Sequence, residues 1–174
     1  DLQTDEYLED LLKKCIQQNR ESAKENNADE KPILVKVAPD LTDEQLAIIA
    51  RTARASGLSG IVATNTTISR PELDGKTGQK FLQESGGLSG KPLLKRSTEV
   101  IKLIYQETEG QLPIIGVGGI SNADDAWEKI INGACLVQFY SAFVFEGPTV
   151  TKSIVKGLKR KLKQYSLDSL DQAV

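Results

Sequence analysis

The 174-residue chain contains no histidine, no methionine and only two cysteines. The absence of histidine excludes histidine-based catalysis. Cys15 and Cys135 lie in different segments with no C-x-x-C pair, which excludes a zinc site, and no metal is expected. Both cysteines are predicted to be buried thiols. Because the chain has no methionine and starts at Asp1, we expect that residues upstream are missing.

The chain also lacks a long hydrophobic run and an excess of positive charge. No stretch approaches the roughly 20 apolar residues that a membrane-spanning helix needs, and the first residues do not form a signal peptide. With 22 Lys and Arg against 24 Asp and Glu, the formal charge is -2, so no nucleic-acid partner is expected. An apolar content of 39% is enough for one packed domain, and small-molecule chemistry is the better expectation.

Four short apolar runs predict strands of a parallel sheet. They occupy residues 33–38, 60–63, 113–117 and 136–142. A segment with helical spacing follows each run. Thr42 and Gln45 form a capping box for the helix after the first run, and Ser121 is predicted to cap the helix after the third. A further helix is expected at about residues 4–18, and the polar segment 17–31 is predicted to be an exposed insertion.

Strict alternation of strand and helix predicts a parallel sheet with right-handed crossovers. Rossmann-type and barrel folds both fit this alternation. The barrel is favoured because no G-x-G-x-x-G follows the first strand and because polar residues stand at the carboxyl ends of all four strands. A closed barrel needs eight units and typically about 250 residues. The fold class is therefore α/β, with about four βα units of a (β/α)8 TIM barrel.

Lys36 interrupts an otherwise apolar strand and needs an anionic or electron-rich partner there. The partner is either a carboxylate on a neighbouring strand or a ligand at the barrel mouth that gains negative charge. At the next strand end, alternation predicts Asn65 and Thr67 on one face and Thr64 and Thr66 on the other. These side chains are either a polar lead into a turn or a binding group, and an amide suits the edge of a pyrimidine ring.

Two glycine-rich turns lead into helices, at residues 86–90 and 116–121. Glycine lets the backbone approach a ligand closely, and exposed N–H groups favour an anion. If the last two strands correspond to the seventh and eighth of a barrel, Gly118-Gly119 and Tyr140-Ser141 form its phosphate site. The alternative is that the turns serve packing only. The long connection 66–92 is expected to be a lid or ligand cradle.

Five motifs occur in a fixed order: KVAPD (36–40), TNTT (64–67), GGLSGKPL (86–93), GVGGIS (116–121) and VQFYSAFVFEGP (137–148). Together they closely resemble the C-terminal half of the class 2, quinone-dependent dihydroorotate dehydrogenases. The resemblance runs from about residue 32 to the end of the last helix. It implies a flavin oxidoreductase of pyrimidine biosynthesis, in which FMN is reduced by dihydroorotate and reoxidised by a quinone.

The resemblance also implies a role for individual residues. Lys36 would lie beside the flavin pyrimidine ring and stabilise its reduced form, and Thr64 would bond the flavin. Asn65 and Thr66 would hold orotate. The flavin ribityl and phosphate groups would be lined by Ser89, Gly90, Gly118, Gly119, Tyr140 and Ser141.

No catalytic residue is expected in this chain, because the base of this family is a serine in the N-terminal half. Residues 1–174 are interpreted as the C-terminal half of one FMN-binding barrel domain, inactive alone, with the N-terminal half as its partner. Quinone and membrane contacts would come from that other half, at the mitochondrial inner membrane in a eukaryote or the cytoplasmic membrane in a bacterium. The alternatives are a non-redox phosphate-binding isomerase or lyase and a non-catalytic remnant.

Overall fold

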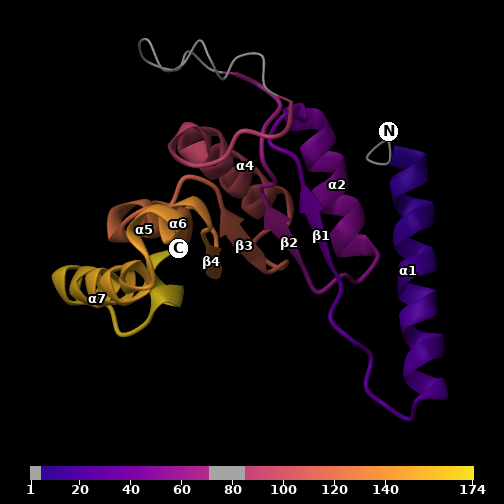
Figure 1. The fold of residues 1–174 in the computed structure, drawn as a ribbon. Coiled ribbons are helices and arrows are strands. Elements are labelled where there is room, and N and C mark those ends of the chain that lie inside the picture. Colours follow the sequence, from indigo (N-terminus) through magenta and orange to yellow (C-terminus); the bar gives the residue numbers. More distant parts are fainter. Residues whose placement is uncertain (1–4, 71–84) are drawn as a thin grey trace.

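A four-stranded parallel sheet forms the centre of the computed structural model, which describes residues 5–70 and 85–174 (Figure 1). The strands lie in the order β1-β2-β3-β4, so each strand pairs with its neighbour in sequence. Their bounds are β1 Leu34–Val37, β2 Gly60–Ala63, β3 Ile114–Val117 and β4 Leu136–Gln138. The predicted fourth strand is too long, because helix α6 already begins at Ser141.

Helices follow the strands, as the alternating pattern predicts. They are α1 Asp5–Glu25, α2 Asp43–Ala55, α4 Leu94–Glu107, α5 Ala123–Ile131, α6 Ser141–Glu146 and α7 Thr149–Gln164, with short 3-10 turns η1 Lys91–Leu93 and η2 Leu170–Ala173. The capping box of α2 is confirmed, since the backbone N–H groups of Thr42 and Gln45 each donate to the other's side chain.

The predicted cap of α5 is wrong by one residue. Asn122, and not Ser121, is the N-cap, and its side chain accepts hydrogen bonds from the backbone N–H groups of Asp124 and Asp125. Ser121 instead donates to the Asp125 carboxylate through both its backbone N–H and its hydroxyl. Serine and asparagine are both common N-cap residues, so the sequence does not decide between them. In the structure, Asn122 has the extended backbone conformation of an N-cap.

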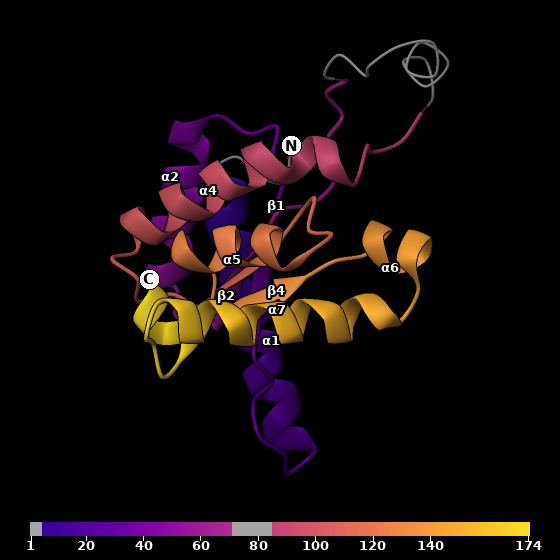
Figure 2. The same cartoon turned by 90° about the vertical axis from the view of Figure 1, so that its left-hand side faces the viewer.

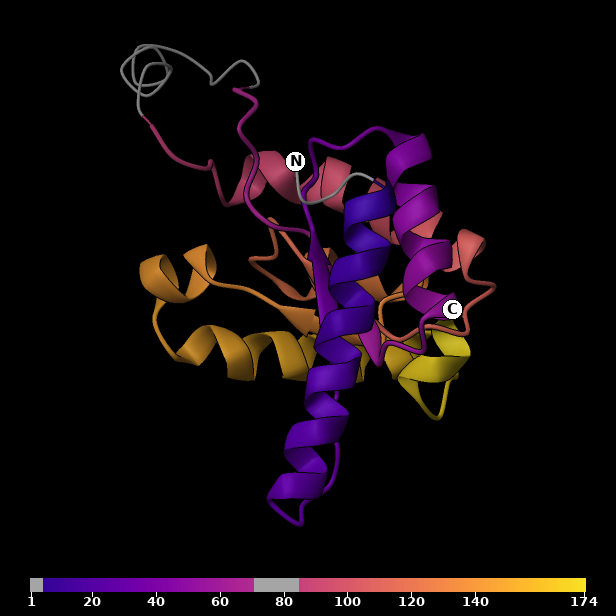
Figure 3. The same ribbon diagram turned by 90° about the vertical axis from the view of Figure 1, so that its right-hand side faces the viewer.

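Helix α1 is longer than the sequence predicts. It continues to Glu25, so the first part of the segment 17–31 is helical, although most of the segment is exposed as expected. Figure 3 shows α1 beside α2, with its C-terminal end extending beyond the sheet. The side-chain amide of Asn19 donates to the carbonyl of Lys31 and accepts from its N–H, which joins the returning chain to the helix.

In the described part of the chain, α2, α4 and α5 pack on one face of the sheet, and the other face is open. Figure 2 shows α4, α5 and α7 side by side on the covered face. Ile61 and Ile114 point to that face and are fully buried, whereas Leu34 and Leu136 on the opposite face are 38% and 60% exposed. A Rossmann-type fold covers both faces, so this sheet has the one-sided cover of a barrel wall.

The prediction that both cysteines are buried is wrong, since Cys15 and Cys135 are exposed. Cys15 lies on α1, whose buried side carries Leu8 and Leu12 instead. Cys135 directly precedes β4, the last strand of the sheet, whose outer edge has no partner strand among the described residues. The sequence pattern does not reveal that this edge is open.

Candidate functional site

A cleft of about 540 Å³ lies at the carboxyl ends of the strands. Every binding residue predicted from the sequence lines it: Lys36, Thr64, Asn65, Thr66, Ser89, Gly90, Gly118, Gly119, Tyr140 and Ser141. A larger groove of about 740 Å³ lies between α1 and α2, but it contains none of these residues. The cleft is therefore the candidate site, since polar groups gather at the strand ends where barrel active sites lie.

The end of β2 places three polar residues in the cleft. The N–H of Thr64 donates to the Val117 carbonyl at 3.0 Å, and the N–H of Asn65 donates to the Val37 carbonyl at 2.8 Å. Thr64, Asn65 and Thr66 all line the cleft, so the prediction of alternating faces is wrong for them. The reason is that β2 ends at Ala63, and the alternation of an extended strand does not continue beyond it.

Thr67 points away from the cleft and holds the loop in place. Its side chain is buried, and its hydroxyl donates to the Asp40 carboxylate, which also accepts from the N–H of Ile68 at 3.1 Å. Thr67 forms a β-bridge with Leu88. The Asp40 carboxylate therefore fixes the course of the chain immediately after Thr66.

The loop 86–90 packs directly on this segment. A Cβ atom on Gly87 would lie 2.0 Å from the Thr66 hydroxyl oxygen, so only glycine fits there. Further along the loop, the Ser89 and Ser141 hydroxyl oxygens lie 3.1 Å apart and join it to the start of α6. Most of the predicted lid, residues 71–84, lies outside the described residues.

The Gly118-Gly119 turn passes over the start of α4. Both residues have positive φ, 124° and 73°, which favours glycine. A Cβ on Gly118 would lie 2.7 Å from the Ser97 hydroxyl oxygen, and one on Gly119 would lie 2.7 Å from the Leu94 backbone. Close packing against α4 thus requires glycine in this turn, as the packing alternative predicted. The same turn also forms part of the cleft wall.

Lys36 lies on the open face of the sheet, where its neighbour on β2 is Val62. The side chain is exposed, and the described residues include no ion pair to it. The alternative of a carboxylate on a neighbouring strand is therefore not realised within this sheet. The ammonium group remains available to a ligand in the cleft.

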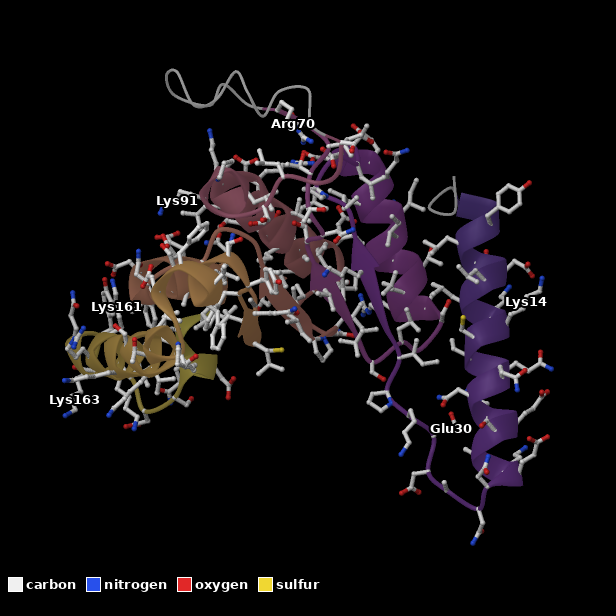
Figure 4. All side chains as sticks on the ribbon, viewed as in Figure 1. Lys14, Glu30, Arg70, Lys91, Lys161 and Lys163 are labelled. Carbon is white, nitrogen blue, oxygen red and sulfur yellow. The ribbon has the colours of Figure 1, made fainter. Side chains whose placement is uncertain are left out.

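Sequence reasoning missed a charged pair in the cleft wall. The Lys91 ammonium lies 3.1 Å from the Asp125 carboxylate, which also accepts the two hydrogen bonds from Ser121. Burial raises the pKa of Asp125, but hydrogen bonds from Ser121 and the charge of Lys91 outweigh burial and lower it. Figure 4 shows Lys91 on the side of the molecule away from Lys14 and Glu30. The sequence did contain one indication of a role for Lys91, because this residue directly follows the predicted binding residues Ser89 and Gly90.

The family model for dihydroorotate dehydrogenase matches residues 1–162. The chain belongs to the dihydroorotate dehydrogenase family. A relative named dihydroorotate dehydrogenase (quinone) from Trichodesmium erythraeum is 53% identical over 152 residues, which make up 85% of this chain and 40% of the relative. A relative of the same name from a Cyanothece species is 48% identical over 97% of this chain and 44% of its own length. The chain spans less than half the length of these relatives.

A solved structure from this family has the same fold. The crystal structure of the Eimeria tenella enzyme in complex with ferulenol superposes with a TM-score of 0.86 and 32% identity, over 99% of this chain and 48% of that one. This likeness and the one-sided parallel sheet confirm the predicted α/β class and partial barrel. None of the helices in residues 5–70 and 85–174 is long and apolar enough to cross a membrane.

Proposed function

We propose that this chain supplies the flavin-phosphate end and part of the orotate site of an FMN-dependent dihydroorotate dehydrogenase that reduces a quinone. One observation carries the proposal: every residue that the family resemblance assigns to cofactor or substrate lines the same cleft. Its volume of about 540 Å³ is in the usual range for a small-molecule site, roughly 300–1,000 Å³.

The residues present fit an FMN phosphate. The Gly118-Gly119 turn and the Tyr140-Ser141 turn follow adjacent strands, β3 and β4, as the two phosphate loops of a barrel do. Only glycine fits this turn against α4, and backbone N–H groups at such a turn favour an anion. The ribityl hydroxyls would meet Ser89 and Gly90. Lys91 adds a positive charge to the same wall of the cleft.

The residues at the other end of the cleft would bind and align the reacting rings. When bound, the flavin accepts a hydride from the substrate. Lys36 would place positive charge beside the bound flavin ring, where negative charge develops, and electrostatic support of that kind acts strongly in a site closed to water. The Asn65 amide and the Thr66 hydroxyl can donate to and accept from orotate, which fixes its orientation for the transfer.

The complete enzyme needs a second half-barrel. Leu34 and Leu136 are exposed on the open face, and neither β1 nor β4 has a partner strand at its outer edge among the described residues. We assign the closing of this face, the base that removes the substrate proton, the quinone contacts and any membrane association to an N-terminal half. The cyanobacterial relatives favour the bacterial cytoplasmic membrane as the location, with the mitochondrial inner membrane as its eukaryotic counterpart.

The test is the visible spectrum and intact mass of the purified protein, followed by mass identification of any released flavin. The proposal expects a flavin band, released FMN, and a polypeptide or partner chain beyond the 174 residues. A colourless protein that binds another phosphorylated compound would overturn it in favour of a non-redox barrel. A protein that binds neither would favour the non-catalytic alternative.

A further inference from the structure

Lys129 on α5 is a lysine buried completely behind the cleft wall, and no step of the proposed function uses it. Its ammonium nitrogen lies 2.8 Å from the Leu94 carbonyl oxygen, 2.5 Å from the Ser97 hydroxyl oxygen and 2.6 Å from the Thr98 hydroxyl oxygen. An ammonium group has three N–H donors, and each therefore has an acceptor. All three acceptors belong to the first turns of α4.

The same part of α4 is the surface on which the Gly118-Gly119 turn lies. The Leu94 backbone would be 2.7 Å from a Cβ on Gly119, and the Ser97 hydroxyl oxygen is 3.2 Å from the Gly118 carbonyl oxygen. That hydroxyl also lies 2.7 Å from the Leu93 carbonyl oxygen and 3.3 Å from the Leu94 carbonyl oxygen, so Ser97 joins the helix start to the turn. A movement of this helix start would displace the glycine turn.

The network continues along α5 to the surface of the cleft. Asp125 is one helical turn before Lys129, accepts from Ser121 and pairs with Lys91. Both ends of the chain segment 118–121 are thus attached to α5, one through Asp125 directly and the other through Lys129 and Ser97. A buried charged group with all its partners supplied fixes geometry strongly, because leaving any partner unpaired in the interior is costly.

We propose that Lys129 is a positioning residue for the phosphate turn: it holds the start of α4 so that Gly118 and Gly119 present their backbone to the cofactor phosphate. This inference rests on the proposed function. Lys129 touches no ligand itself. Its loss should weaken the binding of flavins that carry a phosphate and leave binding through the isoalloxazine ring and ribityl chain unchanged.

The test compares FMN with riboflavin, which lacks the phosphate. Both are titrated at about pH 6, below the Lys129 pKa of about 7, into the apo form of the enzyme that contains this chain, and binding is followed by flavin fluorescence. Lys129→Met is expected to weaken FMN by about tenfold, as for loss of a buried hydrogen bond to a charged group, with riboflavin within about twofold. Ser97→Ala should act in the same direction, which keeps the test valid if Lys129→Met does not fold.

Thr98→Ser is the matched control, because it changes a partner of Lys129 but keeps the hydroxyl that accepts from the ammonium group. It should leave the ratio of FMN to riboflavin affinity unchanged. Equal losses for both flavins in Lys129→Met and Ser97→Ala, or no loss in either, would overturn the inference and leave Lys129 as a stabilising residue only. Failure of the unmodified enzyme to bind FMN would instead refute the proposed function, so the two failures are distinguishable.

Discussion

The two ends of the cleft are built differently. At the proposed phosphate end, Gly118 is buried and packs on Ser97, whose hydroxyl accepts from Lys129, and both side chains are fully buried. At the proposed ring end, Lys36 and Asn65 are exposed at the open face of the sheet. The glycine turn at the phosphate end is therefore backed by buried side chains of α4 and α5, whereas the ring end is open to solvent among the described residues. Cofactor anchoring and ring chemistry are thus expected to depend on different parts of the enzyme.

The largest expected effect comes from Gly119→Ala. The new Cβ meets the Leu94 backbone at 2.7 Å, so the turn must move, and FMN affinity should fall by more than about a hundredfold in a fluorescence titration. Gly57→Ala is the control, since Gly57 has nearly the same φ of +74° but nothing within 4 Å of its Cβ position. It should cost about 1 kcal/mol of stability and leave FMN affinity unchanged. Equal losses of FMN affinity in Gly119→Ala and Gly57→Ala would contradict a specific role for the Gly118-Gly119 turn in binding the cofactor.

Lys36→Met tests the ring end. The variant should keep its FMN, while kcat falls by about a hundredfold because a charge that supports the transition state is gone. Steady-state kinetics and flavin content measure the two effects separately. Lys102→Met, an exposed lysine on α4, is the control and should leave both unchanged. Loss of FMN together with activity in Lys36→Met would show that the two ends are not separable.

Asn65→Ala should have a smaller effect, confined to the substrate. Loss of an amide that donates to and accepts from orotate is expected to raise KM for dihydroorotate by about tenfold. The FMN dissociation constant should remain the same. An unchanged KM with a weaker FMN complex would move Asn65 from the substrate to the cofactor, contrary to its proposed role.

A separate expected effect, on stability and not on binding, is a dependence on pH. Burial lowers the pKa of Lys129 to about 7, against opposing contributions from Asp125 and Glu128. Between this value and the ordinary lysine pKa, the unfolded chain binds a proton that the folded chain does not. The free energy of unfolding should therefore rise with pH above about 7, by at most about 1.4 kcal/mol per unit.

Urea unfolding of the unmodified protein and of Lys129→Met, at several values from about pH 6 to pH 9, measures this slope. The absence of histidine from the chain leaves few other groups to titrate near pH 7. The slope should be smaller in Lys129→Met. The same slope in both proteins would show that Lys129 is not its origin.

The strand positions and the cleft residues could be predicted because polar motifs follow short apolar runs, and parallel strands bring their carboxyl ends to one edge. The C-terminal part of α1 could not be predicted, because residues 17–25 are mostly exposed and their apolar residues show no helical periodicity. The burial of Lys129 was not predicted, because a lysine in an amphipathic helix is usually on the solvent-exposed face. The exposure of Cys135 depends on an open edge that local sequence does not encode.

The most direct test of the account is the anaerobic addition of dihydroorotate to the purified enzyme while its visible flavin band is recorded. The account predicts that the band bleaches on addition of dihydroorotate and returns on addition of a quinone, with the rate lowered in Lys36→Met. A bound flavin whose band is unaffected by dihydroorotate, in an enzyme that contains all of its chain, would contradict the proposed reaction.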